Sequence, residues 1–245
     1  MRPHLSHVDG EALPWEEILN TGAERKQLSI DPDTGSDTSF VRIPKGWRGP
    51  AGAHYHSGFE EALILSGDVD LNGNDLLVEG SYLYRPGGIV HGWVDHSPSG
   101  SDIIIKMGRA TDLISVGEPK HDHEYDYPGK RVDDGRPHII HLKTNEQGWE
   151  HWPGAPEGVE KKRLSLDEFN GAETFLVRIS PNYKDTLELD PSSTWEWIVL
   201  EGSISLADTT KFERLGYSHR PAGSEDTVIT SSHGGCTMLM WSAPT

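Results

Sequence analysis

Apolar residues along the chain gather in short runs that are separated by turn-forming residues. A typical run, Ala62–Leu65, is followed at once by Ser and Gly. Short runs that are rich in β-branched residues and bounded by Gly, Pro, Asn or Asp predict the strands of a sandwich or barrel. The best amphipathic helix candidate, Pro14–Asn20, is too short to contribute much helix. The pattern therefore predicts an all-β chain.

The same pattern repeats within the chain. Four segments recur in the same order, the first two 136 residues later and the last two 135 residues later. The matching segments are Leu28–Ile30 with Leu164–Leu166, Val41–Ile43 with Val177–Ile179, Glu61–Gly67 with Glu196–Gly202, and Arg85–Gly88 with Arg220–Gly223. Such a repeat indicates two copies of one β-domain. We therefore expect one domain at residues 1–115 and another at 146–245. The connector at 116–145 is rich in Pro, Gly and charge, which is typical of an extended surface segment.

The first copy carries a cluster of potential metal ligands. His54, His56 and Glu60 are separated by even intervals, and side chains two apart on a strand point to one face of the sheet. Two imidazoles and a carboxylate on one face are the triad associated with non-haem iron and related ions. Further along, Pro86-Gly-Gly is expected to turn the chain so that His91 returns across the same cavity. Three His and one Glu would then converge and leave coordination positions open for water or substrate.

Glu61 is the alternative to Glu60 within this cluster. The interval to Gly67 and the parity with His56 both select Glu60. Glu61 then points to the opposite face of the strand, where we expect it to be a surface or inter-domain charge.

The two stretches resemble the paired signatures of the cupin superfamily, Gly-x5-His-x-His-x3-Glu-x6-Gly and Gly-x5-Pro-x-Gly-x2-His-x3-Asn. The second signature matches from Gly80 to His91 in every spacing and differs only at its last position, where Asp95 replaces Asn. The first matches from His54 to Gly67, although its leading Gly is not at the family's distance. The resemblance implies a small antiparallel jelly-roll barrel, or double-stranded β-helix, with one metal ion held inside by the four ligands.

Two such barrels in tandem form a bicupin. The chain is similar to the subgroup that contains the cupin of anti-sigma factors and the acetylacetone-type dioxygenases. The resemblance implies one divalent transition metal per chain, with Fe(II) preferred. Mn(II), Ni(II), Cu(II) and Zn(II) stay open because affinity alone does not choose among them. Within this site we expect Glu60 and His91 to take part in catalysis.

The second copy lacks the ligand set. In place of His54, His56, Glu60 and His91, in that order, it has Leu189, Pro191, Trp195 and Asp226. We therefore expect a barrel that has kept its fold without an ion. Its interior is predicted to be filled by side chains such as those of Trp195 and Trp197, as is usual for small barrels.

Residues next to the signatures are candidates for the wall of the cavity. The Pro-Gly-Gly turn is preceded by Tyr82, Tyr84 and Arg85. Trp93 lies two residues after His91 and therefore has the same parity along the strand. The guanidinium group of Arg85 can receive a carboxylate substrate through two parallel hydrogen bonds. However, Arg220 repeats Arg85 in the copy without ligands, which favours a structural role. Trp93 is equally consistent with core packing.

Composition and charge exclude several classes of protein. The formal net charge is −17 and the basic residues do not cluster, so the chain lacks the positive face that nucleic-acid binding requires. It has no apolar stretch of membrane-helix or signal-peptide length, and its single cysteine cannot form an internal disulfide. We therefore expect a cytoplasmic protein without membrane or nucleic-acid partners. Ala62–Leu65 is apolar on both faces of its strand, so we expect both faces to be buried. The second face is then covered by the other barrel or by another subunit, and a homodimer is the preferred prediction.

These observations leave three functional hypotheses. The first is a metal-dependent dioxygenase that acts on a small enolisable or dioxygenated organic molecule, with the ion as Lewis acid or as the site of dioxygen chemistry. The second is a non-catalytic cupin that senses a small ligand or an oxidant. The third is a metal-dependent isomerase or lyase of a sugar or keto acid, which needs no dioxygen. Fold alone does not choose among them.

Overall fold

The chain is built almost entirely of antiparallel strands. The structure, a computed structural model, describes residues 2–50, 52–71, 75–206, 210–224, 228–231 and 233–245. Among these residues there is no α-helix, and one 3-10 turn, η1, occupies Thr144–Glu146. The all-β prediction is confirmed. The chain divides into two compact units, which are described separately below.

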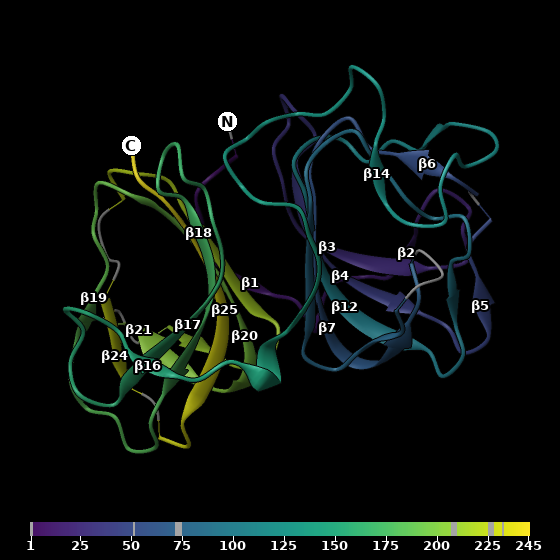
Figure 1. Cartoon of the computed structure of the whole chain (residues 1–245). Helices are drawn as coiled ribbons and strands as arrows, with labels where there is room; N and C mark the ends of the chain where they lie inside the picture. Colours follow the sequence, from purple (N-terminus) through teal and green to yellow (C-terminus); the bar gives the residue numbers. More distant parts are fainter. Residues whose placement is uncertain (1, 51, 72–74, 207–209, 225–227, 232) are drawn as a thin grey trace. The chain divides into compact units, whose positions relative to one another are not determined.

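Unit 1 comprises residues 14–145 and is formed around one large sheet (Figure 1). The strand order is β15 (Ile139–Lys143), β9 (Ser81–Arg85), β7 (Glu60–Val69), β12 (Ser101–Met107), β4 (Asp37–Ile43), β3 (Glu24–Ile30) and β2 (Glu16–Glu17), with β8 (Leu77–Val78) paired to β7. Short strand pairs complete the unit: β5 (Trp47–Arg48) with β11 (His96–Ser97), β6 (His54–Tyr55) with β13 (Ile114–Ser115), and β10 (Ile89–Val90) with β14 (Tyr125–Asp126).

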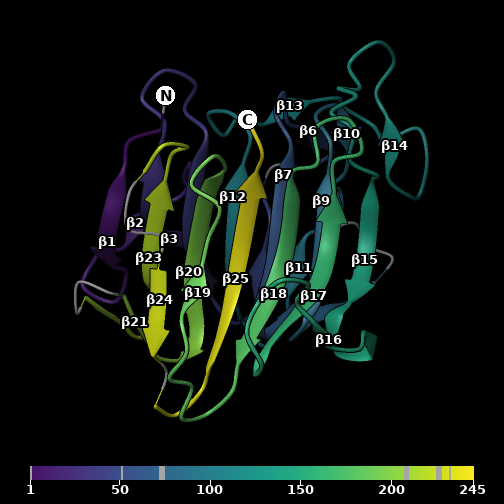
Figure 2. The same ribbon diagram turned by 90° about the vertical axis from the view of Figure 1, so that its left-hand side faces the viewer.

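Unit 2 comprises residues 2–13 and 146–245. Its large sheet, seen face-on in Figure 2, has the order β1 (Leu5–Asp9), β23 (Gly216–Arg220), β20 (Thr194–Gly202), β25 (Cys236–Ala243), β18 (Glu173–Ile179), β17 (Val159–Leu166) and β16 (Glu150–His151). A smaller sheet has the order β19 (Leu187–Glu188), β24 (Val228–Ser231), β21 (Ile204–Leu206) and β22 (Lys211–Phe212).

The two large sheets have the same topology and the same irregularities. Their strands correspond one to one in spatial order, and each sheet contains β-bulges at matching positions. The pairing of β3 with β4 skips Leu28, and the pairing of β17 with β18 skips Leu164. Likewise β7 bulges at Leu65 and β20 at Leu200. Bulges are built-in features of a fold rather than defects, so the repeat seen in the sequence is also a repeat of sheet structure.

A glycine with the same backbone conformation lies in β7 and in β20. Gly67 and Gly202 both have φ of +73°, and a Cβ atom on either would lie about 2 Å from a backbone carbonyl oxygen, that of Gly100 or Gly235. Only glycine fits a positive φ with so close a backbone approach. The Gly at the end of each Glu-x5-Gly segment is therefore required by local geometry in both units.

The compact units do not coincide with the predicted domains 1–115 and 146–245. The difference is the unit to which each leading strand belongs. Residues 3–8 and 137–142 share the pattern Pro-His-x-x-His-x. The first segment forms β1, which pairs with β23 of unit 2, and the second forms β15, which pairs with β9 of unit 1. The leading strand of each repeat therefore completes the sheet of the other repeat, which separation along the sequence does not reveal.

The predicted connector, residues 116–145, is part of unit 1. Its backbone makes hydrogen bonds from Val116 N to Ala53 O, from Val132 N to Gly87 O and from Thr144 N to Gly80 O. It also contains β14 and β15. The prediction of an extended surface segment therefore describes only part of it, because its backbone pairs with the strands that carry the signatures.

The helix candidate Pro14–Asn20 is not helical. It contains the short strand β2, and Leu19 and Asn20 have positive φ values of 46° and 58°. Trp15 instead makes two cation–π contacts, with the Arg42 guanidinium 4.4 Å and the Lys26 ammonium 5.1 Å from the centre of its ring. Pairing with β3 and these cation–π contacts outweigh a weak helical tendency.

Candidate metal centre

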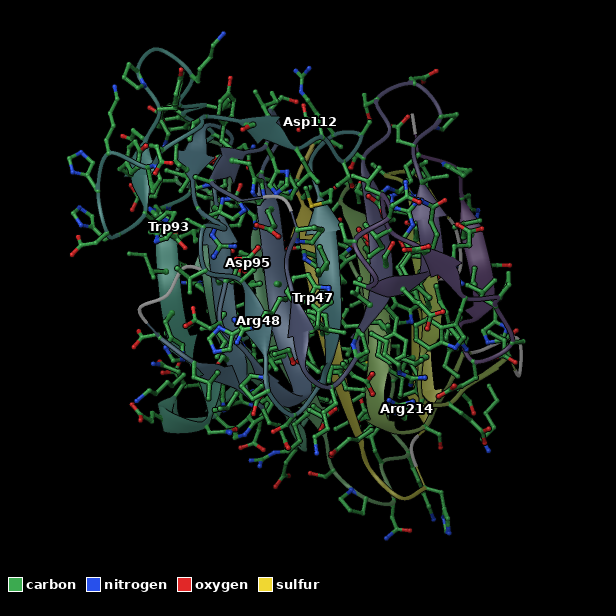
Figure 3. The ribbon with its side chains drawn as sticks, turned by 90° about the vertical axis from the view of Figure 1, so that its right-hand side faces the viewer. Trp47, Arg48, Trp93, Asp95, Asp112 and Arg214 are labelled. Carbon is green, nitrogen blue, oxygen red and sulfur yellow. The ribbon has the colours of Figure 1, made fainter. Side chains whose placement is uncertain are left out.

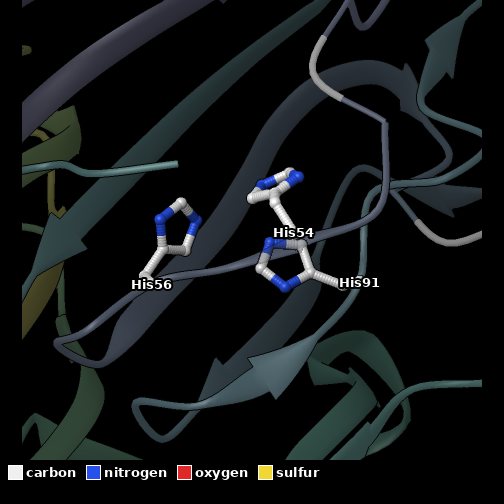
Figure 4. Close-up of side chains that lie close together, drawn as sticks. All are labelled: His54, His56 and His91. Atoms are coloured by element: carbon white, nitrogen blue, oxygen red, sulfur yellow. The ribbon is translucent and has the colours of Figure 1, made fainter. Parts of the chain in front are cut away.

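Three histidines of unit 1 converge at one point. His54 lies in β6, His56 follows two residues later, and His91 follows directly after β10. His54 and His91 face each other across an antiparallel bridge, with backbone N–O distances of 3.0 Å and 2.9 Å. One ring nitrogen from each of the three lies within 4.8 Å of the others, and Figure 4 shows the three rings gathered together. No other group of this kind occurs in the described part of the chain.

Backbone carbonyls fix the orientation of all three rings. The Nδ1 atom of His54 lies 2.7 Å from Gly52 O, that of His91 lies 3.0 Å from Ile89 O, and that of His56 contacts Asp112 O. A carbonyl oxygen only accepts hydrogen bonds, so each Nδ1 carries the proton and each Nε2 has a free lone pair. This is the arrangement by which proteins orient histidine ligands of a metal ion.

Burial keeps these rings in the form that binds metals. It lowers the pKa of His54, and it lowers the pKa of His91 well below its usual value, with the nearby Arg85 charge adding to the effect. Both rings are therefore neutral at neutral pH. Neutral imidazole is the ligand form, so protons do not compete for these two nitrogens.

Glu60, at the start of β7, adjoins the histidine cluster. Its Oε2 atom lies 3.4 Å from His91 Nε2 and 3.9 Å from His56 Nε2. The same oxygen accepts a hydrogen bond of 2.8 Å from Arg85 Nη1. Burial favours the protonated acid, but the charge and hydrogen bond of Arg85 outweigh it, so the pKa of Glu60 lies below its usual value. The carboxylate is therefore ionised at the edge of the cluster.

A second carboxylate holds Arg85 from the other side. Arg85 Nε and Nη2 donate to Glu124 Oε1 at 2.9 Å and 2.7 Å, and Glu124 Oε2 lies 2.6 Å from His138 Nε2. The Glu124 side chain is fully buried. Burial favours the protonated acid, but the charge of Arg85 and the hydrogen bonds with His138 and Arg85 outweigh it. The pKa of Glu124 is therefore lowered. Glu60, Arg85 and Glu124 therefore form one buried, charged chain of contacts.

The cluster opens into an apolar cavity of about 150 Å³ within unit 1. Its polar lining includes the three histidines, Glu60, Arg85 and Asp95, together with an ion pair between Arg25 and Asp37. Trp47 and Asp95, labelled in Figure 3, belong to different segments that approach each other over Gly49. The apolar lining includes Ile18, Ala23, Val41, Ile43, Trp47, Pro50, Ala62, Leu71, Ile103, Ile105, Met107 and Leu113. A few polar groups in an apolar pocket are typical of a small-molecule site.

Asp95 stands out among the polar residues of this cavity. Its Oδ1 atom is buried and has no hydrogen-bond partner among the described residues. Burial raises the pKa of Asp95 to about 8, and the neighbouring carboxylates of Glu60, Asp70 and Glu124 add to the rise against the opposing charge of Arg85. At neutral pH this carboxyl group therefore keeps its proton and can donate a hydrogen bond.

The predicted wall residues have different positions. Arg85 lines the cavity, whereas Tyr82, Tyr84 and Trp93 are not among its lining residues. The two tyrosines alternate with Arg85 along β9 and so point to the other face of the sheet. There Tyr82 donates a hydrogen bond of 2.6 Å to Glu61, and Tyr84 donates one to Asp134.

Trp93 and Glu61 also lie outside the lining of the cavity. Trp93 is half-buried against Ala53, Tyr55 and Val90, away from the cavity lining. Glu61 is almost fully buried rather than exposed on the surface. The hydrogen bond from Tyr82 puts Glu61 on the opposite face of β7 from Glu60, as strand parity predicts.

Two residues near the cluster, Glu124 and Asp95, are not assigned to this site by the sequence. Glu124 lies in the segment predicted to be a surface connector, and only the tertiary structure brings it to Arg85. In the sequence, Asp95 differs from the second signature, which has Asn at this position. This difference indicates that a carboxyl group replaces an amide beside the ligands.

The corresponding interior of unit 2 is filled. Leu189 and Trp195, which stand where His54 and Glu60 stand in unit 1, are buried in its hydrophobic core. Ser39 and Ala62 of the cavity correspond to Phe175 and Trp197. Both aromatic side chains are fully buried, and the Asp226 position lies outside the described residues. Larger side chains therefore occupy the volume that is open in unit 1.

Residues 4–111 match the family model of the ChrR cupin-like domain. This stretch contains both signatures and all three clustered histidines. The first part of the chain is therefore similar to that cupin-like domain. No curated protein sequence matches the chain.

Solved structures resemble the whole chain in fold. A candidate dioxygenase from Nostoc punctiforme has a TM-score of 0.79 at 18% identity, with 98% of this chain and 82% of that chain covered. The protein Ylba from Escherichia coli has a TM-score of 0.66 at 13% identity, with coverage of 97% and 89%. Oxalate decarboxylase from Bacillus subtilis has a TM-score of 0.63 at 12% identity, with coverage of 99% and 78%. These similarities establish a cupin fold.

No helix within the described residues is long and apolar enough to cross a membrane.

Proposed function

We propose that this protein is a metal-dependent dioxygenase that acts on a small enolisable or dioxygenated organic molecule. The observation that carries the proposal is the set of three imidazoles whose Nδ1 atoms are held by backbone carbonyls and whose Nε2 atoms face an apolar cavity. The similarity to the candidate dioxygenase supports the oxygenase class among cupin activities. Fe(II) is the preferred ion because imidazole and carboxylate ligands with open positions suit it.

We further propose that the two units are tandem cupin barrels, of which the N-terminal one is active. The shared strand order and the matching bulges support a duplication. The open cavity in unit 1 and the aromatic filling of unit 2 support a single active centre. The predicted homodimer and cytoplasmic location stay predictions.

The residues present fit a divalent transition metal. His54, His56 and His91 would hold it through Nε2, and Glu60 would add a carboxylate oxygen. When bound, such an ion supplies Lewis acidity and, for iron, access to dioxygen chemistry. Arg85 keeps Glu60 oriented, since it donates to the same oxygen that faces the histidines.

The other groups of the cavity position the substrate. The apolar side chains of Ile103, Ile105 and Met107 keep bulk water away from the polar end. Asp95, whose buried Oδ1 atom has no hydrogen-bond partner among the described residues, offers a polar contact to an oxygen-bearing group of the substrate. An oxygen-bearing end of the substrate is therefore expected to face the histidines and Asp95.

The cavity volume limits the size of the substrate. An apolar cavity of roughly 150 Å³ can hold a benzene-sized molecule, and the cavity of unit 1 has about that volume. Short diketones and simple catechols match this size, whereas flavonol-sized compounds exceed it. The structure thus favours the smallest members of the proposed substrate class.

The test begins with elemental analysis of protein purified without chelators. The wild type should carry a near-stoichiometric transition metal, and His91→Ala should lose it. His96→Ala is the matched control, because His96 is a partly exposed histidine of the same segment that lies outside the cluster. A metal-free wild type under all loading conditions would refute the proposal.

Oxygen-electrode assays of iron-loaded protein then test the activity. Small diketones and catechols should cause oxygen consumption that His91→Ala abolishes. Turnover of a small keto acid or sugar without oxygen would instead favour the isomerase or lyase class. Tight ligand binding with no product would favour a sensor.

A further inference from the structure

The segment after the matched cupin-like domain contributes a buried charge to the metal centre. Glu124 lies outside residues 4–111 and belongs to the stretch that the sequence identified as a connector. Its neighbour Asp122 has a fully exposed side chain, whereas the side chain of Glu124 is completely buried. A fully buried carboxylate is costly unless its partners are fixed, so this residue has a specific role in the unit.

The contacts of Glu124 immobilise Arg85. Both Nε and Nη2 of Arg85 donate to Glu124 Oε1, and Nη1 donates to Glu60 Oε2. With three donor nitrogens engaged on two sides, the planar guanidinium group has a fixed orientation. The position of Glu60 Oε2, 3.4 Å from His91 Nε2, follows from that orientation.

The charges of this chain of contacts add up to an excess of one negative charge. Arg85 alone would neutralise Glu60, and the histidine ligands are neutral, so the Glu60–Arg85 pair by itself would offer a divalent cation no net negative charge. Glu124 offsets Arg85 and leaves the charge of Glu60 available to a cation. Because all three side chains are buried, solvent screens these interactions only weakly.

We propose that Glu124 is a positioning residue that sets the affinity of the three-histidine site for a divalent metal by holding and neutralising Arg85. This inference rests on the metal centre of the proposed function. It adds a requirement that neither cupin signature contains. Partners that orient metal ligands from outside the coordination shell typically change metal affinity by about 10- to 100-fold.

The test measures Co(II) binding to the full chain by calorimetry and by visible absorption of the bound ion. Glu124→Gln keeps the shape of the side chain and removes its charge. It should weaken Co(II) binding about 10- to 100-fold and alter the absorption spectrum. Asp122→Asn is the control, because it removes a charge from an exposed side chain two residues before Glu124. It should leave both readouts unchanged.

A double variant separates positioning from a merely structural role. Combining Arg85→Gln with Glu124→Gln removes the uncompensated positive charge, so Co(II) should bind more tightly than to Glu124→Gln alone. A structural role predicts that the double variant binds no better. Binding by Glu124→Gln within twofold of wild type, or a double variant no tighter than the single one, would overturn the proposal.

Two further outcomes are distinguished by the same measurements. If Glu124→Gln does not fold, as judged by circular dichroism, Glu124→Asp replaces it: this variant keeps the charge but shortens the reach to Arg85. It should bind Co(II) more weakly than wild type, and equal binding would overturn the inference. A wild type that binds no Co(II) would overturn the proposed metal centre itself, whereas a binding wild type with an unaffected Glu124 variant overturns only this inference.

Discussion

Asp95→Asn should stabilise the protein, and the gain should grow with pH. The wild-type carboxyl group has a pKa of about 8 in the folded protein, against a usual value of 3.8. A group whose pKa is raised on folding binds more protons in the folded state, so its contribution to stability is complete below pH 3.8 and is lost as the pH rises toward 8. Asn resembles the protonated acid in shape, does not titrate and is the residue that the cupin signature carries at this position.

The size of the effect follows from the same pKa values. Each pH unit between the unfolded and folded pKa costs wild type about 1.4 kcal/mol. At pH 7 the accumulated cost is on the order of 4 kcal/mol. The change of this free-energy difference with pH is a stricter test than its value at one pH. Any difference in packing between Asp and Asn adds a contribution that does not depend on pH.

The assay is urea unfolding of wild type and Asp95→Asn between pH 5 and 8, in the presence of a chelator. The difference in free energy of unfolding should rise by about 1.4 kcal/mol per pH unit up to about pH 7, and more slowly as the pH approaches the folded-state pKa of about 8. Asp133→Asn, at an exposed aspartate, should show no such slope. A difference between wild type and Asp95→Asn that is constant with pH would refute the reasoning. In metal-loaded protein the slope should be shallower, because a nearby cation favours the ionised carboxylate.

Two other substitutions test the fold and the cavity. Gly67→Ala should destabilise unit 1 by more than about 2 kcal/mol in urea unfolding, since its Cβ would collide with a backbone oxygen at a positive φ. Gly46→Ala has a similar φ of +77° but open space around it, and it should cost only about 1 kcal/mol; equal losses would contradict the steric argument. Ala62→Trp copies the residue of unit 2 into the cavity, and it should abolish turnover of small diketones while the metal content stays near wild type. Unimpaired turnover would show that the substrate binds elsewhere.

Much of the fold and the core of the candidate site could be predicted from local patterns. Strand periodicity placed His54 and His56 on one face, and the Pro-Gly-Gly turn brought His91 toward them. The offset of 135 to 136 residues identified a repeat that the matching bulges reproduce in the structure. These features depend on residues close together in sequence, whose geometry the strand itself fixes.

The partition of the chain could not be predicted in this way. The leading strands β1 and β15 carry nearly the same sequence pattern, and each is complementary to the same kind of sheet edge. Which edge each one joins depends on hydrogen bonds between segments far apart in the chain. The sequence therefore predicted two β-domains with a connector, and the structure assigned the strands between them.

The same division applies to the site. By itself the sequence determined the all-β class, the repeat and the candidate ligands, because these follow from periodicity and spacing. Only the tertiary structure decided that Glu124 holds Arg85, that Tyr82 and Tyr84 point away from the cavity, and that unit 1 is open where unit 2 is filled. Those outcomes depend on which side chains share a buried volume and which charges meet there, and such contacts join residues that no local pattern links.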